Sequence, residues 1–323
     1  MIHNLISHLK KAQNILITSH AKPDGDAIGS TVALGLALKR HNKYVTLYNK
    51  SKINNKYYTI LPSSLLIKKK ITDIENYDTA IFLDCSRMNM AGNAAEKILE
   101  IGAVINIDHH KTNTGYGNFQ YIDPKAASTT EMVYRLISEM QVPLNKEMAE
   151  AIYLGILTDT GSFRYSNTSK QTYEICADLM KFEVNPFLIA RAAYGNYSIN
   201  RIKLIGVALD TVELFEDGQI AIMSLTSDMI RKTGATHEDA MGLLDYAVNI
   251  KNVKIAALIK EYSIEDETED NQYEYSVSLR SNGDIDVSAI AINFDGGGHP
   301  SAAGFLINSE LAELKIKLSK LLK

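Results

Sequence analysis

Four apolar runs of strand length, separated by helical patterns, constrain the fold of this chain more than any other feature of its sequence. The runs cover residues 14–18, 44–47, 79–83 and 103–107, and the helical patterns cover residues 27–40 and 128–140. Strands that alternate with helices pair in parallel and are covered by helices on their faces. We therefore predict an α/β fold whose ligand site lies beyond the carboxyl ends of its strands.

The second half of the chain has a different pattern. Helical segments dominate from residue 146 to about residue 210, and one of them begins at Asn185-Pro186. After Thr211, strand-like runs occur in pairs joined by turn residues. The pairs are residues 212–215 with 219–225, and 253–264 with 273–280, with the acidic run 265–270 as a solvated hairpin loop.

The length of 323 residues suits two domains better than one, since a typical domain has about 100 to 200 residues. We predict an N-terminal domain with a parallel sheet, a helical linker, and a smaller C-terminal α/β domain with a mixed sheet. The predicted bounds are residues 1–190, 191–210 and 211–323.

Composition excludes several classes of protein. No run approaches the roughly 18 apolar residues of a membrane span, and the first 14 residues read as an amphipathic helix, so we predict no membrane partner. Two cysteines, Cys85 and Cys176, cannot form a thiolate zinc site, and they favour a cytoplasmic location. A net charge of −4 argues against long duplex DNA as a partner. Any nucleic-acid substrate should be short.

The first cluster of chemically active side chains follows the run at residues 14–18. His20, Asp24 and Asp26 lie within seven residues, and Pro23 and Gly25 shape the loop between them. Two aspartates would avoid pointing together unless a cation lies between them. The alternative is a helix-capping aspartate beside a surface histidine.

The same pattern recurs at two further strand ends. Asp84 follows the run at residues 79–83, and Asp108-His109-His110 follows the run at residues 103–107. Any one of these residues alone would more often be a cap or a turn residue. Because the carboxyl ends of parallel strands meet at one edge, the recurrence predicts that they share one crevice.

A further carboxylate, Asp159, ends an apolar helical stretch that begins near Ala149. A carboxylate at a helix C-terminus faces the negative end of the helix dipole, and a bound metal ion would remove that conflict. The alternative is that Asp159 starts an Asx-turn with Gly161.

The donors gathered in this way are oxygen and nitrogen atoms, without thiolate. Such a set suits a pair of divalent cations, Mn²⁺ first, with Mg²⁺ or Co²⁺ as substitutes. Two ions about 3.5 to 4 Å apart activate water for attack on phosphorus.

A glycine-rich segment, Gly296-Gly297-Gly298-His299, closes the series. Consecutive glycines let backbone amides approach phosphate oxygens, although glycine runs are commonly flexible turns. Upstream, Arg280 leaves a strand on its polar face, where it could bind a phosphate through two hydrogen bonds. The alternative for Arg280 is a solvated surface arginine.

Together the motifs HAKPDGDAIGS, LDCS, DHH, TDTGSF and GGGHPSAAGF resemble the DHH phosphoesterase family, in the subgroup with a DHH-associated C-terminal domain that includes nanoRNase/pAp phosphatases. They occur in that family's order over almost the whole chain. The resemblance implies that His20, Asp24 and Asp84 hold one metal ion. It implies that Asp26, Asp84, His109 and Asp159 hold the other, with Asp84 as the bridge.

The resemblance also implies roles for the remaining candidates. His110 would contact phosphate, and Asp108 would orient the histidines, so catalysis would rest on Asp84, His109, His110 and Asp108. Arg280, Gly297, Gly298 and His299 would hold the phosphate or nucleotide of the substrate, with Ser281 and Arg164 nearby. The family often has a fourth glycine where this chain has Asp295.

The resemblance implies hydrolysis of short oligoribonucleotides or dinucleotides, and of 3′-phosphoadenosine 5′-phosphate to AMP. Cleavage of cyclic or linear di-adenylate is an alternative of the same class. A non-catalytic nucleotide-binding module is the alternative of a different class, and the presence of all six ligands argues against it. Cleavage polarity and oligomeric state, including a homodimer, are left open.

Overall fold

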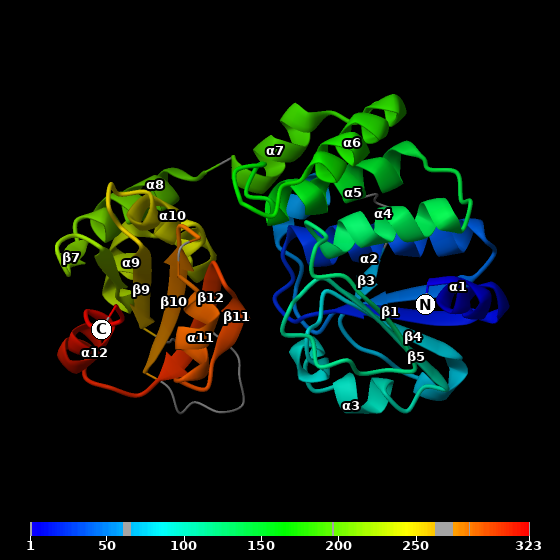
Figure 1. The fold of residues 1–323 in the computed structure, drawn as a ribbon, viewed down its shortest axis with the longest axis horizontal. Helices are drawn as coiled ribbons and strands as arrows, with labels where there is room; N and C mark the ends of the chain where they lie inside the picture. The colour runs from blue at the N-terminus through cyan, green and yellow to red at the C-terminus, as the bar shows by residue number, and fades with distance from the viewer. Residues whose placement is uncertain (1, 61–65, 196, 262–273, 284, 323) are drawn as a thin grey trace. The chain divides into compact units, whose positions relative to one another are not determined.

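The computed structural model describes residues 2–60, 66–195, 197–261, 274–283 and 285–322 (Figure 1). The side chains of Asn55, Tyr58 and His299 are outside this description, as is the predicted acidic loop at 265–270. The chain divides into two compact units, Met1–Asn196 and Tyr197–Lys323. The division falls within the segment predicted as a linker, and the predicted bounds at 190 and 210 stay predictions.

The first unit contains a six-stranded sheet and its helices. Its strands are β1 (Asn14–Ser19), β2 (Tyr44–Tyr48), β3 (Ile67–Lys68), β4 (Thr79–Leu83), β5 (Ala103–Asp108) and β6 (Phe119–Ile122). Its α-helices are α1 (Ile2–Lys11), α2 (Gly25–Arg40), α3 (Ala95–Ile98), α4 (Thr129–Glu139), α5 (Lys146–Asp159), α6 (Lys170–Leu179) and α7 (Pro186–Tyr194). Short 3₁₀ turns are η1 (Asn55–Thr59), η2 (Ile74–Asn76), η3 (Met88–Ala91) and η4 (Met180–Phe182).

All the strands of this sheet are parallel, in the order β3-β2-β1-β4-β5-β6. The four predicted runs are confirmed as β1, β2, β4 and β5. The chain builds outward from β1 through β2 and β3, and then continues on the other side of β1 with β4. The strand order therefore reverses between β1 and β4, which is where open α/β sheets bind their ligands.

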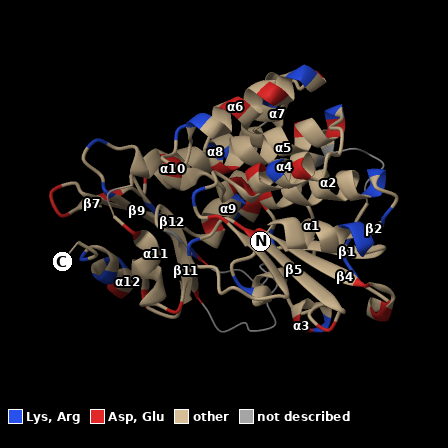
Figure 2. Ribbon diagram, turned by 45° about the vertical axis from the view of Figure 1, so that its right-hand side comes forward, with Lys and Arg blue, Asp and Glu red and all other residues tan. Residues whose placement is uncertain are grey.

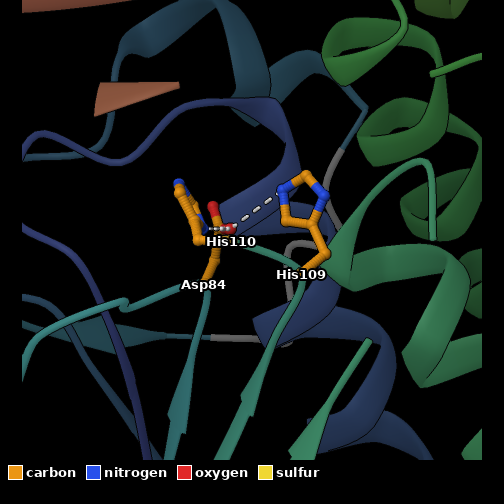
Figure 3. Close-up of side chains that lie close together, drawn as sticks. All are labelled: Asp84, His109 and His110. Carbon is orange, nitrogen blue, oxygen red and sulfur yellow. Dashed lines mark ion pairs between the residues drawn. The ribbon is translucent and has the colours of Figure 1, made fainter. Parts of the chain in front are cut away.

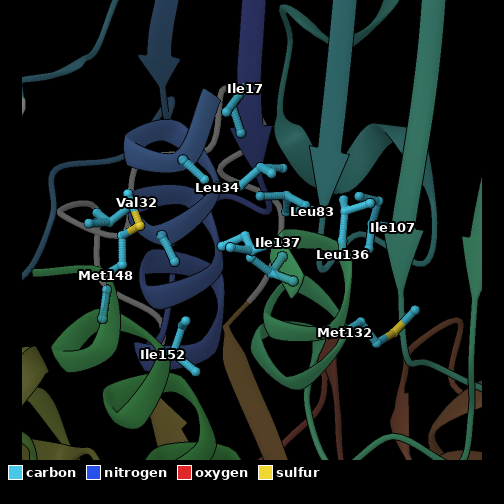
Figure 4. Packing of buried hydrophobic residues seen from close by; sticks show 14 of the residues in the cluster. Ile17, Val32, Leu34, Leu83, Ile107, Met132, Leu136, Ile137, Met148 and Ile152 are labelled. Atoms are coloured by element: carbon cyan, nitrogen blue, oxygen red, sulfur yellow. The ribbon is translucent and has the colours of Figure 1, made fainter. Parts of the chain in front are cut away.

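Apolar side chains of alternating strand positions build a core on each face of the sheet. Figure 4 shows Ile17, Leu83 and Ile107 of the strands against residues of α2, α4 and α5, which cover one face. On the other face, Phe82 is fully buried in a cluster that includes Ile98 of α3. Fully burying each such side chain contributes about 1.5–3 kcal/mol to the free energy of unfolding. Packing on both faces therefore stabilises the strands whose ends carry the site.

The second unit contains a mixed six-stranded sheet in the order β11-β12-β10-β9-β8-β7, which confirms the predicted α/β unit. The β8–β9 pair is parallel and the other neighbouring pairs are antiparallel. Its strands are β7 (Glu213–Phe215), β8 (Ile220–Leu225), β9 (Ile255–Glu261), β10 (Tyr275–Ser281), β11 (Gly297–His299) and β12 (Ala302–Ile307). Its helices are α8 (Ile199–Leu209), α9 (Ser227–Thr233), η5 (His237–Ala240), α10 (Leu243–Val248), α11 (Val287–Ile292) and α12 (Leu311–Leu318).

Charged residues are dispersed over both units, with Lys and Arg interspersed among Asp and Glu (Figure 2). Among the helices in the described part of the chain, none combines the length and the apolar character that a membrane crossing requires.

Candidate metal centre

The residues predicted to gather at the strand ends do lie together, at the carboxyl edge of the first unit's sheet. His20 directly follows β1, Asp84 follows β4, and Asp108 is the last residue of β5, with His109 and His110 after it. These strands are neighbours in the sheet, so their ends bring the side chains to one place.

One group consists of His20, Asp24 and Asp84. The Nε2 atom of His20 lies 3.4 Å from Oδ2 of Asp84 and 3.9 Å from Oδ1 of Asp24. Nδ1 of His20 lies 2.8 Å from the carbonyl oxygen of Ala21, which can only accept, so Nδ1 carries the proton. Nε2, on the other side of the ring, is thus the nitrogen that is directed at two carboxylates.

A second group consists of Asp26, His109 and Asp159, which come from α2, the end of β5 and the end of α5. The Nε2 atom of His109 lies 3.4 Å from Oδ2 of Asp159. Its Nδ1 atom lies 3.3 Å from the carbonyl oxygen of Ala126. Nδ1 of His109 therefore also donates to a backbone carbonyl, and Nε2 is directed at the carboxylates.

Asp84 connects the two groups through its two carboxylate oxygens. Oδ2 faces His20, while Oδ1 lies 3.7 Å from Nε2 of His109 and 3.6 Å from Nδ1 of His110. Figure 3 shows the two histidines converging on Asp84 from the neighbouring strand end. Asp84 adopts a left-handed backbone conformation with φ 57°, which aspartate and asparagine tolerate better than most other residues.

The shortest of these spacings, 3.4 Å from His20 to Asp84 and from His109 to Asp159, fits two ligands of a shared cation. Distances of 3.4 to 3.9 Å between histidine nitrogens and carboxylate oxygens exceed hydrogen-bond length. Two ligands that each lie about 2.1 Å from one ion are about 3.0 to 3.4 Å apart for octahedral or tetrahedral angles. The described residues therefore include groups that could hold metal ions.

The pKa values of the buried carboxylates are shifted in opposite directions from their ordinary values. Burial raises the pKa of Asp26 to about 7, and the negative charges of Asp84 and Asp24 add to this. Burial and the same kind of repulsion raise the pKa of Asp159. At Asp84, burial is outweighed by His20, His110 and His109, and its pKa lies well below the usual range. A pair of divalent cations would neutralise this repulsion.

The structure also bears on the simpler roles that the sequence left open for Asp24, His20 and Asp159. Asp24 does cap α2, because its Oδ1 accepts from the backbone N–H groups of Asp26 and Ala27. His20, however, is not a surface histidine, since its side chain is 16% exposed. At the end of α5, the N–H of Gly161 donates to the carbonyl of Thr158. This N–H group is therefore hydrogen-bonded without an Asx-turn to Asp159.

Asp108 is fully buried and orients one of the two histidines. Its Oδ1 lies 2.6 Å from Nδ1 of His110, and its Oδ2 accepts from the amide of Asn113. His110 thereby presents Nε2 on the opposite side of its ring. The Nδ1 atom of His109 has the carbonyl of Ala126 as its partner, so Asp108 and a backbone carbonyl divide the orienting role.

Of the remaining predicted site residues, Arg164 lies in the first unit, and Arg280 and Ser281 lie in the second. Arg164 is exposed beyond the end of α5, and its Nε donates to the carbonyl of Gly161. Arg280 and Ser281 end β10; Nη1 of Arg280 donates to the carbonyl of Leu279, and the Ser281 hydroxyl faces the carbonyl of Pro300.

The glycine-rich segment forms β11, an edge strand that pairs with β12. A Cβ on Gly296 or Gly298 would lie 2.3 or 2.4 Å from a backbone oxygen of β12, so packing requires glycine at both positions. A Cβ on Gly297 would meet no atom within 4 Å. The backbone of His299 belongs to β11, and its side chain lies outside the described structure.

Sequence reasoning missed the residues that support this centre. The N-terminus of α4 donates to Asp26 and Asp84 through Thr129 and Thr130. The sequence Ser128-Thr129-Thr130-Glu131 is typical of a capping box. Ser128 does cap α4 by accepting from the N–H of Glu131, whereas the Glu131 carboxylate accepts from Ala127.

Comparison with known protein families agrees with this architecture. The family model "DHH family, N-terminal domain" matches residues 14–156, and the model "DHHA1 domain" matches residues 217–323. The two matches fall in the first and the second unit respectively.

Two curated proteins named bifunctional oligoribonuclease and PAP phosphatase NrnA are similar over most of their length. The protein of Thermus thermophilus is 31% identical over 93% of this chain and 86% of its own, and that of Bacillus subtilis is 28% identical over 94% and 93%. Among solved structures, an exopolyphosphatase-related protein from Bacteroides fragilis superimposes with a TM-score of 0.88 at 28% identity. That match covers 99% of this chain and 94% of the other.

Proposed function

We propose that this chain, which belongs to the DHH family and carries a DHHA1 domain, is a metal-dependent hydrolase of short oligoribonucleotides and of 3′-phosphoadenosine 5′-phosphate. The observation that carries the proposal is the pair of ligand groups that meet at the two oxygens of Asp84. The names of the T. thermophilus and B. subtilis relatives support the substrate class.

The donor set favours Mn²⁺, with Mg²⁺ or Co²⁺ as substitutes, because it contains carboxylate and imidazole groups and no thiolate. His20, Asp24 and Asp84 would hold one ion, and Asp26, Asp84, His109 and Asp159 the other. When bound, such a pair supplies an activated water and neutralises charge that develops on the phosphate.

The protein's own residues then orient and stabilise the substrate. His110, held through Nδ1 by the buried Asp108, presents its other nitrogen at the centre and can donate a hydrogen bond to a phosphate oxygen. Burial lowers the pKa of His110, but Asp108 and Asp84 outweigh it and leave this pKa above the ordinary value. The imidazole is thus favoured as a donor to an anion. Arg164, exposed beside the end of α5, is a further candidate for contact with the substrate.

In the second unit, we assign phosphate binding to Arg280, Ser281, Gly297, Gly298 and His299. The space beside Gly297 is open, since a Cβ there would meet no atom within 4 Å, and this leaves room for a ligand to approach the backbone. The edge position of β11 leaves one side of that strand without a strand partner in the described sheet, where a phosphate can meet N–H groups.

Two further expectations accompany the proposal. A cytoplasmic location is supported by the two cysteines, which are both buried and both free. Short substrates, rather than long duplex DNA, are supported by the net charge of −4. A homodimer stays a prediction.

The test is hydrolysis by the full-length chain with Mn²⁺. The panel contains 3′-phosphoadenosine 5′-phosphate, the dinucleotide pApA, a five-nucleotide RNA, cyclic di-AMP and pyrophosphate. AMP release from pApA and from 3′-phosphoadenosine 5′-phosphate is the expected result. Binding of two Mn²⁺ ions without turnover of any substrate would instead support a nucleotide-binding module.

A further inference from the structure

The first turn of α4 connects the two carboxylates that belong to different ligand groups. The N–H of Thr129 donates to Oδ2 of Asp26 at 2.7 Å, and the N–H of Thr130 donates to Oδ1 of Asp26 at 2.9 Å. The hydroxyl of Thr129 donates to Oδ1 of Asp84 at 3.0 Å. One helical turn therefore holds Asp26, which precedes it by about a hundred positions, and Asp84, which follows β4.

These contacts are secluded from water. Thr129, Thr130 and Asp26 are all 0% exposed, and Asp84 is 3% exposed. The hydroxyl of Thr130 makes a further, short hydrogen bond to Oδ1 of Asp26. Buried hydrogen bonds to a carboxylate are stronger than exposed ones, so they restrict the orientation of both aspartates.

The arrangement also limits how each aspartate can bind a cation. Asp26 accepts two backbone N–H groups and one hydroxyl, so most of its acceptor positions are used and its remaining lone pair has a fixed direction. Asp84 accepts the Thr129 hydroxyl on Oδ1, the oxygen that faces His109, while Oδ2 faces His20. The hydroxyl thus fixes the rotation that directs one oxygen to each group.

We propose that Thr129 and Thr130 are positioning residues, in which the Thr129 hydroxyl sets the orientation of Asp84 between the two ligand groups and the Thr130 hydroxyl sets that of Asp26. The inference rests on the proposed two-ion function and adds two residues that orient its metal ligands. Because Asp84 belongs to one group and its Oδ1 faces His109 of the other, loss of the Thr129 hydroxyl weakens both ions. Because Asp26 belongs to one group, loss of the Thr130 hydroxyl weakens one.

The test is calorimetric titration of Mn²⁺ into metal-free protein for wild type, Thr129→Val, Thr129→Ser and Thr130→Val. Loss of a hydrogen bond that orients a metal ligand typically lowers affinity by about 10- to 100-fold. We expect that loss for both equivalents in Thr129→Val, for one equivalent in Thr130→Val, and near wild-type binding in Thr129→Ser. The matched control is Thr31→Val, which removes a buried hydroxyl that bonds the carbonyl of Ala27 inside α2.

Kinetics with pApA provide a second measurement. In Thr129→Val, kcat should fall and recover in part with added Mn²⁺, while KM for pApA at saturating Mn²⁺ stays unchanged. Wild-type Mn²⁺ affinity in Thr129→Val, or an equal loss in Thr129→Ser or Thr31→Val, would overturn the proposal. If Thr129→Val does not fold, Thr130→Val decides it, since that variant keeps both backbone N–H bonds. If wild type binds two Mn²⁺ ions but cleaves no substrate, the proposed function fails while the calorimetry still decides the positioning role.

Discussion

Gly155 of α5 lies directly against Asp26 of α2: a Cβ built on Gly155 would be 2.9 Å from Oδ1 of Asp26 and 2.0 Å from the Thr130 hydroxyl. This small residue makes room for the contact between α4 and Asp26. We predict that Gly155→Ala displaces the Asp26 carboxylate and lowers both stability and Mn²⁺ affinity.

The control for this prediction is Gly206→Ala in α8, where a Cβ would meet no atom within 4 Å. Alanine is favoured over glycine in a helix by about 1 kcal/mol, so Gly206→Ala should stabilise the protein and leave Mn²⁺ binding unchanged. Thermal melts and Mn²⁺ titrations of both variants check the prediction. Stabilisation by Gly155→Ala with intact Mn²⁺ binding would show that the close approach is not required.

The pH dependence of stability should differ between metal-free and metal-loaded protein. The pKa of Asp26 is raised to about 7 in the folded metal-free protein, mainly by burial, so folding favours its protonated form, and this contribution is lost as the pH rises through about 7. The pKa values of His20 and His109 are also raised: burial lowers them, but neighbouring aspartates outweigh it. Their contribution, present below about pH 6.5, is likewise lost as pH rises.

We therefore expect the melting temperature of the metal-free protein to fall between pH 6 and pH 8.5, while added Mn²⁺ raises it more at the higher pH. The ion replaces protons on the same groups, so its affinity should rise with pH. Melts with EDTA or Mn²⁺ across this range make the comparison. A stabilisation by Mn²⁺ that is greatest at pH 6 would contradict this account of the centre.

Gly297 offers a test of the second unit's role that should spare the fold. Since a Cβ there meets no neighbouring atom, Gly297→Ala should melt like wild type. If a substrate phosphate contacts the backbone at this point, KM for pApA should rise about 10-fold or more, as expected when a hydrogen bond to a charged group is lost. An unchanged KM would remove Gly297 from the proposed substrate contacts.

Arg280 should also act on substrate binding. Arg280→Ala is expected to raise KM for pApA by about 10-fold or more through loss of a charge-assisted contact. Arg231→Ala is the control, because that arginine pairs with Asp228 on the surface, with 80% of its side chain exposed. If both variants have the wild-type KM, Arg280 is a solvated surface residue.

The parts of the fold that could be predicted from the sequence were those with a strong local pattern. The fully apolar runs became the central strands because both sides of each are buried, as in Phe82 and Ile81 of β4. The edge strand β6 was missed because its four residues are all only partly buried, so it lacks a continuous apolar run. Edge strands have fewer packing constraints to leave a mark on the sequence.

The candidate site followed the same rule. Carboxylate and histidine residues at strand ends could be predicted to converge because parallel strands share one edge. The hydrogen bonds from Thr129 and Thr130 could not, since they depend on how α4 packs against α2 and α5, which no local pattern encodes. In the sequence, the two threonines follow a capping serine and resemble ordinary first-turn residues of a helix.

The central claim is that Asp84 connects two metal ions in a phosphoesterase centre, and Asp84→Asn tests it most directly. Asparagine tolerates the left-handed backbone at this position and keeps the side-chain volume, but it removes the bridging charge. Mn²⁺ stoichiometry and pApA hydrolysis should be measured on the same preparation as wild type. We predict two bound ions and AMP release for wild type, with weaker binding of both ions and a loss of activity of at least about 1000-fold in the variant. Wild-type turnover by Asp84→Asn would contradict the account.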